Sequence, residues 1–248
     1  MHWVYLGAHT ERLDQVGLGD FDGEKRCDVF AIDQATSTWK IAPGGSGAWT
    51  TLLGTYAGIP MSELRFGDFN GDKITDVFRR APSGQWLAIS PGRWGWTALA
   101  QSSIPLADLR FGDFDGNGIT DVLSLSGGTA SVSWNATSTW QPLNSAIDDL
   151  ESVLIANVDG LPGDNLVRYV ATGPSSGQWM YSSGGSSPWT PFASYQPAAP
   201  APPPRAFVGR FKGGARADLL WIDTVPSRVG RIIDVGEPAF TQYGLYPY

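Results

Sequence analysis

Short runs of alternating apolar and polar residues, separated by turns, make up almost the whole chain. In one well-defined stretch, this pattern predicts four strands at about 64–69, 75–80, 85–90 and 96–100. The segments between them read "NGDKI", "APSG" and "PGRWG", which are rich in the residues of tight turns. No segment of useful length has the period of an amphipathic helix. The sequence therefore predicts an all-β protein.

The four-strand pattern recurs about every 45 residues along the chain. An acidic loop marks each repeat, and its first position falls at residues 20, 68, 113, 157 and 210. Four short strands at this spacing are typical of a β-propeller blade. We expect a single propeller domain over 1–248, most simply with five blades, and a strand at 2–6 that is a candidate to close the ring. Part of a six- or seven-bladed ring is the alternative. The expected blades are about 15–53, 63–100, 108–144, 151–194 and 205–245.

The acidic loop places oxygen-bearing side chains at alternate positions, which we number one to nine. Alternate side chains of an extended chain project to one side, so these oxygens converge, while the apolar residue at position two points into the core. A Gly at position four permits a sharp turn with positive φ. Hard oxygen ligands around such a turn suit Ca²⁺, whereas Mg²⁺ rarely accepts a cage made only of protein. Without a cation, the clustered carboxylates would repel one another.

Three of the loops have a complete set of predicted calcium ligands. The ligands are the side chains at positions one, three, five and nine and the carbonyl oxygen at position seven. They are Asp20, Asp22, Glu24, Arg26 and Asp28 in the first repeat, Asp68, Asn70, Asp72, Ile74 and Asp76 in the second, and Asp113, Asp115, Asn117, Ile119 and Asp121 in the third.

The other two loops keep the spacing but have lost ligands. The fourth retains Asn157, Asp159 and Asn165, with only one carboxylate, so we expect a weak site. In the fifth, Arg210 and Lys212 face Asp218, and two cationic side chains should exclude Ca²⁺. The hairpin is therefore predicted to be part of the scaffold, with the metal as an added brace.

These motifs resemble the FG-GAP or VCBS repeat. The resemblance rests on Phe66-Gly67 followed by "DFNGDKITD" and on Phe111-Gly112 followed by "DFDGNGITD". It implies the β-propeller of integrin α subunits and of some fungal and bacterial lectins, with Ca²⁺ in the loop between the first two strands of a blade. Members of the family commonly have seven blades, more than this chain is long enough to build.

Charge and composition narrow the partners and the location. The net charge of −7 argues against nucleic acid and anionic membrane surfaces, and no apolar run reaches the roughly 18 residues of a membrane span. The single Cys27 excludes an internal disulfide, and we expect its side chain to be half-buried. No secretory signal is predicted at the start of the sequence. Weak calcium sites fill only at millimolar Ca²⁺, which favours an extracellular or periplasmic location.

The repeat is best interpreted as a binding module rather than an enzyme. Its longer loops lie on the face opposite the calcium loops, where we expect a glycan ligand or, second, an extracellular protein; Arg79, Arg80 and Trp94 are the candidate contacts. Only two His residues are present, which leaves little for a His-based catalytic site. The alternatives are an accessory domain of a secreted enzyme or a propeller hydrolase or lyase that uses carboxylates of the long-loop face. Those carboxylates are Glu63, Asp108, Asp148, Asp149 and Glu151.

Overall fold

The computed structural model describes residues 12–33, 35–46, 48–53, 59–93, 95–126, 128–143, 147, 153–194, 205–209, 216–222, 229–234 and 241–244. Several predictions fall outside these residues: the strand at 2–6, the ligand contact Trp94, the loop residues Arg210 and Lys212, and the carboxylates Asp148, Asp149 and Glu151.

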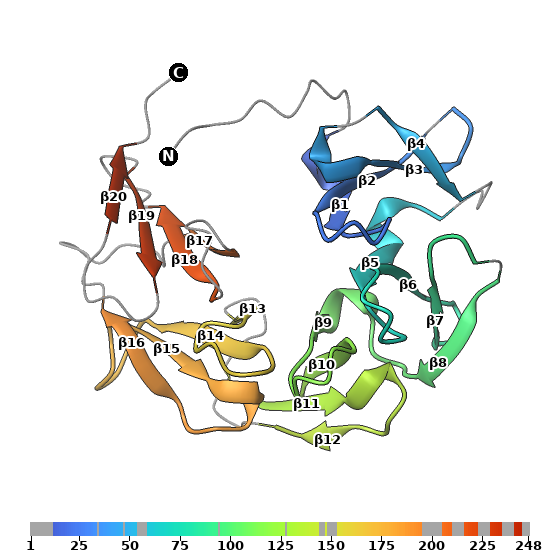
Figure 1. The fold of residues 1–248 in the computed structure, drawn as a ribbon. Helices are drawn as coiled ribbons and strands as arrows, with labels where there is room; N and C mark the ends of the chain where they lie inside the picture. The colour runs from blue at the N-terminus through green and yellow to red at the C-terminus, as the bar shows by residue number, and fades with distance from the viewer. Residues whose placement is uncertain are drawn as a thin grey trace. The chain divides into compact units, whose positions relative to one another are not determined.

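The described chain forms five four-stranded sheets, and within each sheet the strands lie side by side in chain order (Figure 1). The first sheet contains β1 (Val16–Gly19), β2 (Asp28–Ile32), β3 (Trp39–Ala42) and β4 (Thr50–Leu53). The second contains β5 (Leu64–Gly67), β6 (Asp76–Arg80), β7 (Gln85–Ile89) and β8 (Thr97–Gln101). The third contains β9 (Leu109–Gly112), β10 (Asp121–Ser126), β11 (Thr129–Ser133) and β12 (Gln141–Pro142).

The last two sheets repeat the same plan. The fourth contains β13 (Val153–Ala156), β14 (Asn165–Val170), β15 (Gln178–Ser182) and β16 (Thr190–Ser194). The fifth contains β17 (Arg205–Gly209), β18 (Asp218–Ile222), β19 (Val229–Asp234) and β20 (Thr241–Gly244). The described helices are short 3₁₀ turns: η1 (Leu13–Gln15), η2 (Pro43–Gly45), η3 (Met61–Glu63), η4 (Leu106–Asp108), η5 (Trp134–Ala136) and η7 (Ser183–Gly185). None of these is long and apolar enough to cross a membrane.

The predicted fold class is confirmed: the chain is all-β and has the four-stranded antiparallel sheets of a β-propeller. The strands of the second sheet begin and end within two residues of the predicted bounds. Its first hairpin pairs Gly67 with Asp76, so the acidic loop is the connection between β5 and β6. The corresponding hairpin of the first sheet pairs Gly19 with Asp28 in the same way.

Contacts between residues divide the chain into two compact units, each with its own apolar core. One unit comprises Met1–Leu109, Gly118–Val122 and Ser133–Thr139, and the other comprises Arg110–Asn117, Leu123–Val132 and Trp140–Tyr248. The core of the first includes Phe21, Phe30, Trp39, Ile41, Leu64, Val77 and Ile89. The core of the second includes Ala156, Val158, Val167, Trp179, Ala217 and Leu219. Both cores combine residues from successive sheets, which is how one blade stabilises the next.

Tryptophans of the third strand are packing residues in the first, second and fourth blades. These residues, Trp39, Trp86 and Trp179, are almost completely buried. Trp39 of the first blade meets Trp96 of the second edge to face, with ring centroids 6.0 Å apart. Such aromatic pairs stabilise a core beyond the area they bury. The recurring Trp is therefore explained by packing between blades and needs no ligand.

Cys27 differs from the expectation, because its side chain is exposed rather than half-buried. The residue stands at position eight of the first loop. In the later repeats this position faces the preceding blade, as shown below.

Candidate functional site: the acidic loops

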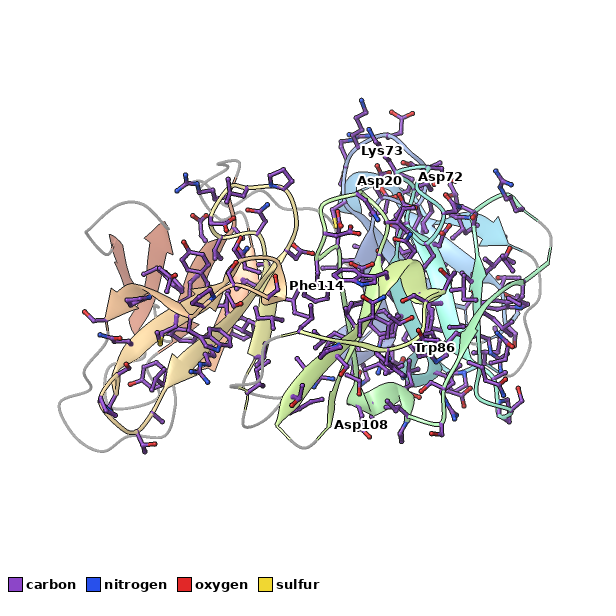
Figure 2. All side chains as sticks on the ribbon, turned by 90° about the horizontal axis from the view of Figure 1, so that it is seen from below. Asp20, Asp72, Lys73, Trp86, Asp108 and Phe114 are labelled. Atoms are coloured by element: carbon purple, nitrogen blue, oxygen red, sulfur yellow. The ribbon has the colours of Figure 1, made fainter. Side chains whose placement is uncertain are left out.

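In the first two blades, the acidic loops lie at one end and the connection to the next blade lies at the other. Figure 2 shows Asp20, Asp72 and Lys73 at one end of these blades, and Asp108 of η4 at the opposite end. This agrees with the predicted division into a loop face and a long-connection face. Asp108 and Glu63 are exposed on the second of these faces.

The residue at position nine fixes the hairpin from inside. The Asp28 carboxylate is fully buried and accepts the N–H of Phe21, at position two, over 2.8 Å. Asp76 accepts the N–H of Phe69 over 2.9 Å in the second loop. In the fourth loop, Asn165 makes the equivalent bond from the N–H of Val158 at 2.7 Å. An amide oxygen thus does the same work as a carboxylate, so position nine is structural whether or not a cation binds.

Position nine also ties the loop to the turn between the third and fourth strands. The second carboxylate oxygen of Asp28 accepts the N–H of Gly44 in η2 over 2.8 Å. Asp121 accepts the N–H of Asn135 in η5 over 2.7 Å. The buried Asp28 carboxylate therefore caps two turns at once, which satisfies both of its oxygens.

Position one shapes the tip of the loop. Asp20 accepts the N–H groups of Gly23 and Lys25, each over 2.8 Å. The second loop repeats this arrangement around Asp68. Gly23 has a φ of 80°, as predicted for position four, and Lys25 has an unpredicted positive φ of 60° at position six. The two backbone bonds to one carboxylate hold this non-Gly residue in the left-handed region.

In two loops the carboxylates at positions one, three and nine come together. One oxygen from each of Asp20, Asp22 and Asp28 lies within 4.8 Å of the others. The same is true of Asp113, Asp115 and Asp121 in the third loop. Three hard oxygen donors at this separation fit a calcium ion, which takes ligands at about 2.3–2.6 Å. Of the side chains at position five, Glu24 is exposed and is not part of the first cluster. Asn117 is also exposed, and its amide nitrogen donates to the Asp115 carboxylate over 3.0 Å.

The second loop is arranged differently because position three is an amide. Asn70 accepts the N–H of Asp72 over 2.8 Å with its single oxygen, and its amide nitrogen donates to Ser90 at 2.7 Å and to Asp76 at 3.4 Å. Burial raises the pKa of Asp76, hydrogen bonds from Ser90 and the Phe69 N–H oppose the rise, and the charges of Asp72 and Asp68 add to it. A nitrogen donor therefore occupies the side of the loop where an acidic residue at position three would present its second oxygen.

The fourth loop keeps the hairpin with amides in place of acids. Asn157 accepts the N–H of Gly160 over 2.8 Å, and its amide nitrogen donates to the carbonyl of Leu161. Asn165 donates to the Asp159 carboxylate over 3.2 Å. The one carboxylate left at a ligand position therefore accepts a hydrogen bond from the Asn165 amide. In the fifth loop Asp218 is buried, like its counterparts at position nine.

Position eight joins each blade to the one before it, a role that the sequence analysis missed. The N–H of Thr75 donates to the carbonyl of Asp20 over 2.7 Å. The same bond recurs from Thr120 to Asp68 at 2.6 Å, from Asp164 to Asp113 at 2.5 Å and from Ala217 to Asn157 at 2.7 Å. Each bond ends on the position-one residue of the preceding loop. The repeated "ITD" of the second and third loops was the signal that could have revealed it.

Some position-eight side chains also accept a hydrogen bond from the N–H of the same position-one residue. The hydroxyl of Thr75 accepts the N–H of Asp20 over 2.9 Å. In the fourth repeat, a carboxylate oxygen of Asp164 accepts the N–H of Asp113 over 2.9 Å. Burial raises the pKa of Asp164, while the bond from Asp113 N–H opposes the rise. Neighbouring acidic loops are therefore connected through the backbone of their first ligand residue.

This joint explains the Gly that precedes the loop. A Cβ on Gly67 would lie 2.6 Å from the hydroxyl of Thr120, closer than real contacts allow. A Cβ on Gly19 would meet Thr75 in the same way. In the fourth repeat the residue is Ala156, and the facing position-eight residue is the smaller Ala217; both belong to one buried cluster. A Gly that faces a Thr and an Ala that faces an Ala thus fill the contact between blades with a similar total side-chain volume.

The candidate ligand contacts of the second blade take part in packing. Arg80 donates from Nε to the carbonyl of Ser102 over 3.1 Å, which fixes the end of β6 to the chain leaving β8. The guanidinium carbon of Arg79 lies 5.8 Å from the Trp96 ring centroid. The same arrangement places Arg168 at 4.3 Å from Trp189 in the fourth blade. A cation over the Trp beside the fourth strand is thus a repeated feature of the blade.

No family model and no curated protein matches the chain. Among solved structures, a lectin from Agrocybe aegerita matches with a TM-score of 0.58 and 14% sequence identity over 94% of this chain and 66% of that one. That structure is described as the basis of specific recognition of non-reducing terminal N-acetylglucosamine. The chain thus spans about two thirds of the lectin it matches. At this identity the likeness shows the fold: the chain is an all-β protein with the β-propeller fold that this lectin also has.

Proposed function

We propose that this protein is a carbohydrate-binding module of the lectin type. The observation that carries the proposal is the match of nearly the whole chain to a propeller lectin, since 94% of its residues align. The net charge of −7 agrees with a neutral ligand rather than a polyanion. Repeated blades offer several related surfaces, and several weak sites together give useful avidity.

We further propose that Ca²⁺ braces the blades rather than contacting the sugar. The supporting features are the two carboxylate clusters, of which the first is formed by Asp20, Asp22 and Asp28. A calcium ion there would compensate the repulsion among the three charges, and it would stabilise a residue, Asp20, whose carbonyl and N–H both bond to the next blade. At millimolar Ca²⁺, a site with a dissociation constant near 0.1 mM would add about 1.4 kcal/mol to the free energy of unfolding.

A glycan array tests the proposed function. The full chain, labelled on an exposed lysine and kept in millimolar Ca²⁺, is expected to bind a restricted set of glycans, with those ending in N-acetylglucosamine as the first candidates. Binding followed by release of a shortened glycan would contradict a pure lectin and favour a hydrolase. Absence of binding to every glycan would overturn carbohydrate recognition and shift the proposal to a protein ligand.

A further inference from the structure

The second blade contains a pocket beside its acidic loop. Its volume is about 360 Å³, toward the lower end of the roughly 300–1,000 Å³ that small-molecule pockets occupy. Polar side chains come from the loop (Asn70, Asp72) and from the stretch that ends β7 and enters β8 (Ser90, Arg93, Thr97). With Asp76, which also lines it, the pocket therefore brings an amide, two carboxylates, two hydroxyls and a guanidinium around one space.

The floor of the pocket is apolar. Phe69, Ala88 and Leu99 form it, and the first two are buried. Ala88 and Ile89 are successive residues of β7, and Ile89 packs in the core of the first compact unit. Since successive side chains of a strand point to opposite faces, the pocket lies on the face of the sheet turned away from that core.

A turn that departs from the repeat accompanies this pocket. In the first and third blades, the 3₁₀ turns η2 and η5 place a backbone N–H on the position-nine carboxylate. In the second blade, the turn after β7 contains no such helix, and the hydroxyl of Ser90 bonds to Asn70 and Asp76 instead. The Ser90 side chain thus takes the place of the backbone N–H that binds the position-nine carboxylate in the other two blades. In the same turn, Arg93 occupies the position of Ser46 in the first blade.

Several of the polar groups are free to meet a ligand. Arg93 is exposed, and its guanidinium makes no hydrogen bond or ion pair with any residue in the described part of the chain. The same holds for the hydroxyl of Thr97, which is also exposed. One carboxylate oxygen of Asp72 accepts the N–H of Ile74 over 2.9 Å, and the second oxygen can accept a hydrogen bond from a ligand. Charged side chains that pair with nothing beside a formed pocket are candidates for ligand contacts.

The mixture of groups selects the class of ligand. Two carboxylates, Asp72 and Asp76, disfavour an anion. The guanidinium of Arg93 and the amide nitrogen that Asn70 turns toward Ser90 disfavour a cation. A neutral molecule whose hydroxyl groups both donate and accept hydrogen bonds satisfies all of these groups together. A pyranose ring also has C–H faces that can lie against Phe69 and Leu99.

We propose that this pocket of the second blade binds a single neutral sugar residue at the acidic-loop end of the protein. The inference rests on the proposed carbohydrate-binding function and places one binding site on the face opposite to the one expected from loop lengths. Arg93 and Asp72 hydrogen-bond the hydroxyl groups, Thr97 borders the ring, and the Asn70–Ser90 bond holds the wall in place.

The experiment tests the pocket by placing a large side chain in it at an exposed residue of its wall. Thr97→Trp places a large ring in the space without replacing a core residue, and Thr190→Trp makes the same change at the corresponding exposed position of the fourth blade. Binding of N-acetylglucosamine and of a panel of free monosaccharides is measured by calorimetry and by saturation-transfer NMR. Thr97→Trp is expected to weaken the affinity of the bound sugar at least tenfold, and Thr190→Trp to leave it within twofold. Arg93→Ala removes a side chain that makes no hydrogen bond or ion pair within the described part of the chain, and it is expected to weaken the affinity about tenfold.

The outcomes separate the two proposals. If the wild-type chain binds no sugar, the proposed function fails, and this inference fails with it. If the wild-type chain binds but Thr97→Trp and Arg93→Ala bind equally well, the pocket is excluded and the lectin function stands. Should Thr97→Trp fail to fold, as judged by its circular dichroism, the Arg93→Ala result alone decides.

Discussion

The hydroxyl of Thr75 accepts the backbone N–H of Asp20 at 2.9 Å, and the backbone N–H of Thr75 donates to the carbonyl of Asp20 at 2.7 Å. Two blades are thus clamped at the first residue of an acidic loop. Thr75 also stands between two predicted ligands of its own loop, Ile74 and Asp76. The residues that shape one loop therefore position the next.

Removing the Thr75 hydroxyl is expected to loosen this clamp. Thr75→Val keeps the branched shape but leaves the Asp20 N–H without its acceptor, which should lower the free energy of unfolding by about 1–2 kcal/mol. Thr75→Ser is the matched control, because it keeps the hydroxyl and loses only a methyl group. Urea denaturation followed by tryptophan fluorescence measures both. Equal stability of wild type and Thr75→Val would show that the hydroxyl bond contributes nothing.

The close approach at Gly67 gives a second prediction. In Gly67→Ala, the new Cβ would lie 2.6 Å from the Thr120 hydroxyl, and the clash should cost about 1–3 kcal/mol. The double variant Gly67→Ala, Thr120→Ala reproduces the pairing of Ala156 with Ala217 in the fourth repeat and should recover part of the loss. A double-mutant cycle on thermal unfolding measures this coupling. Additive losses in the double variant would contradict the steric explanation.

The turn of the third blade contains a strained residue. Ala136 is fully buried with a φ of 55°, whereas the corresponding positions of the first and fourth blades are Gly45 and Gly185. A non-Gly residue in the left-handed region costs the folded state about 1–2 kcal/mol. Replacement by Gly removes this strain, but the greater entropy of Gly in the unfolded chain offsets part of the gain. Ala136→Gly should therefore raise the free energy of unfolding by about 0.5–1 kcal/mol in urea denaturation. A decrease would mean that packing of the buried methyl group outweighs the backbone strain.

The difference between the first two loops predicts how many calcium ions bind. A carboxylate at position three can accept the N–H of position five and still offer an oxygen, whereas the amide of Asn70 has only one oxygen. Asn70→Asp should therefore add a calcium site to the second loop, and Asp22→Asn should remove one from the first. Calorimetric titration with Ca²⁺ counts the sites. Each lost site should lower the melting temperature by about 2–4 °C at millimolar Ca²⁺, and EDTA should abolish the differences.

An unchanged calcium stoichiometry in both variants would contradict this interpretation of position three. Absence of any heat with the wild-type chain would overturn the calcium proposal as a whole. Mg²⁺ titrated at the same concentrations is the control for a general effect of divalent charge.

The fold could be predicted from the sequence because its signals are local and repeated. Strand alternation, turn residues and the spacing of the loops each point to the same blade, and position four has the predicted positive φ at Gly23 and Gly71. What the sequence does not reveal is contact between repeats. The bond from Thr75 to Asp20 joins residues far apart in the chain. Its traces in the sequence are the repeated "ITD" and the Gly or Ala that faces the position-eight side chain.

The candidate site was predictable only in part for a similar reason. The alternation of acids in the first and third loops identified the carboxylates that the structure brings within 4.8 Å of one another. It did not anticipate that Asn70 would turn its amide nitrogen toward Ser90, because that contact depends on a turn that differs from η2, η5 and η7 of the first, third and fourth blades. The pocket beside that loop depends on the same departure from the repeat.

Carbohydrate recognition is tested most directly by calorimetric titration of the full chain with saccharides ending in N-acetylglucosamine, in millimolar Ca²⁺. We predict saturable heat that a matched saccharide with a different terminal residue does not reproduce. Heats indistinguishable from dilution, for these and for every other sugar that the array offers, would contradict the assignment of this propeller to carbohydrate binding.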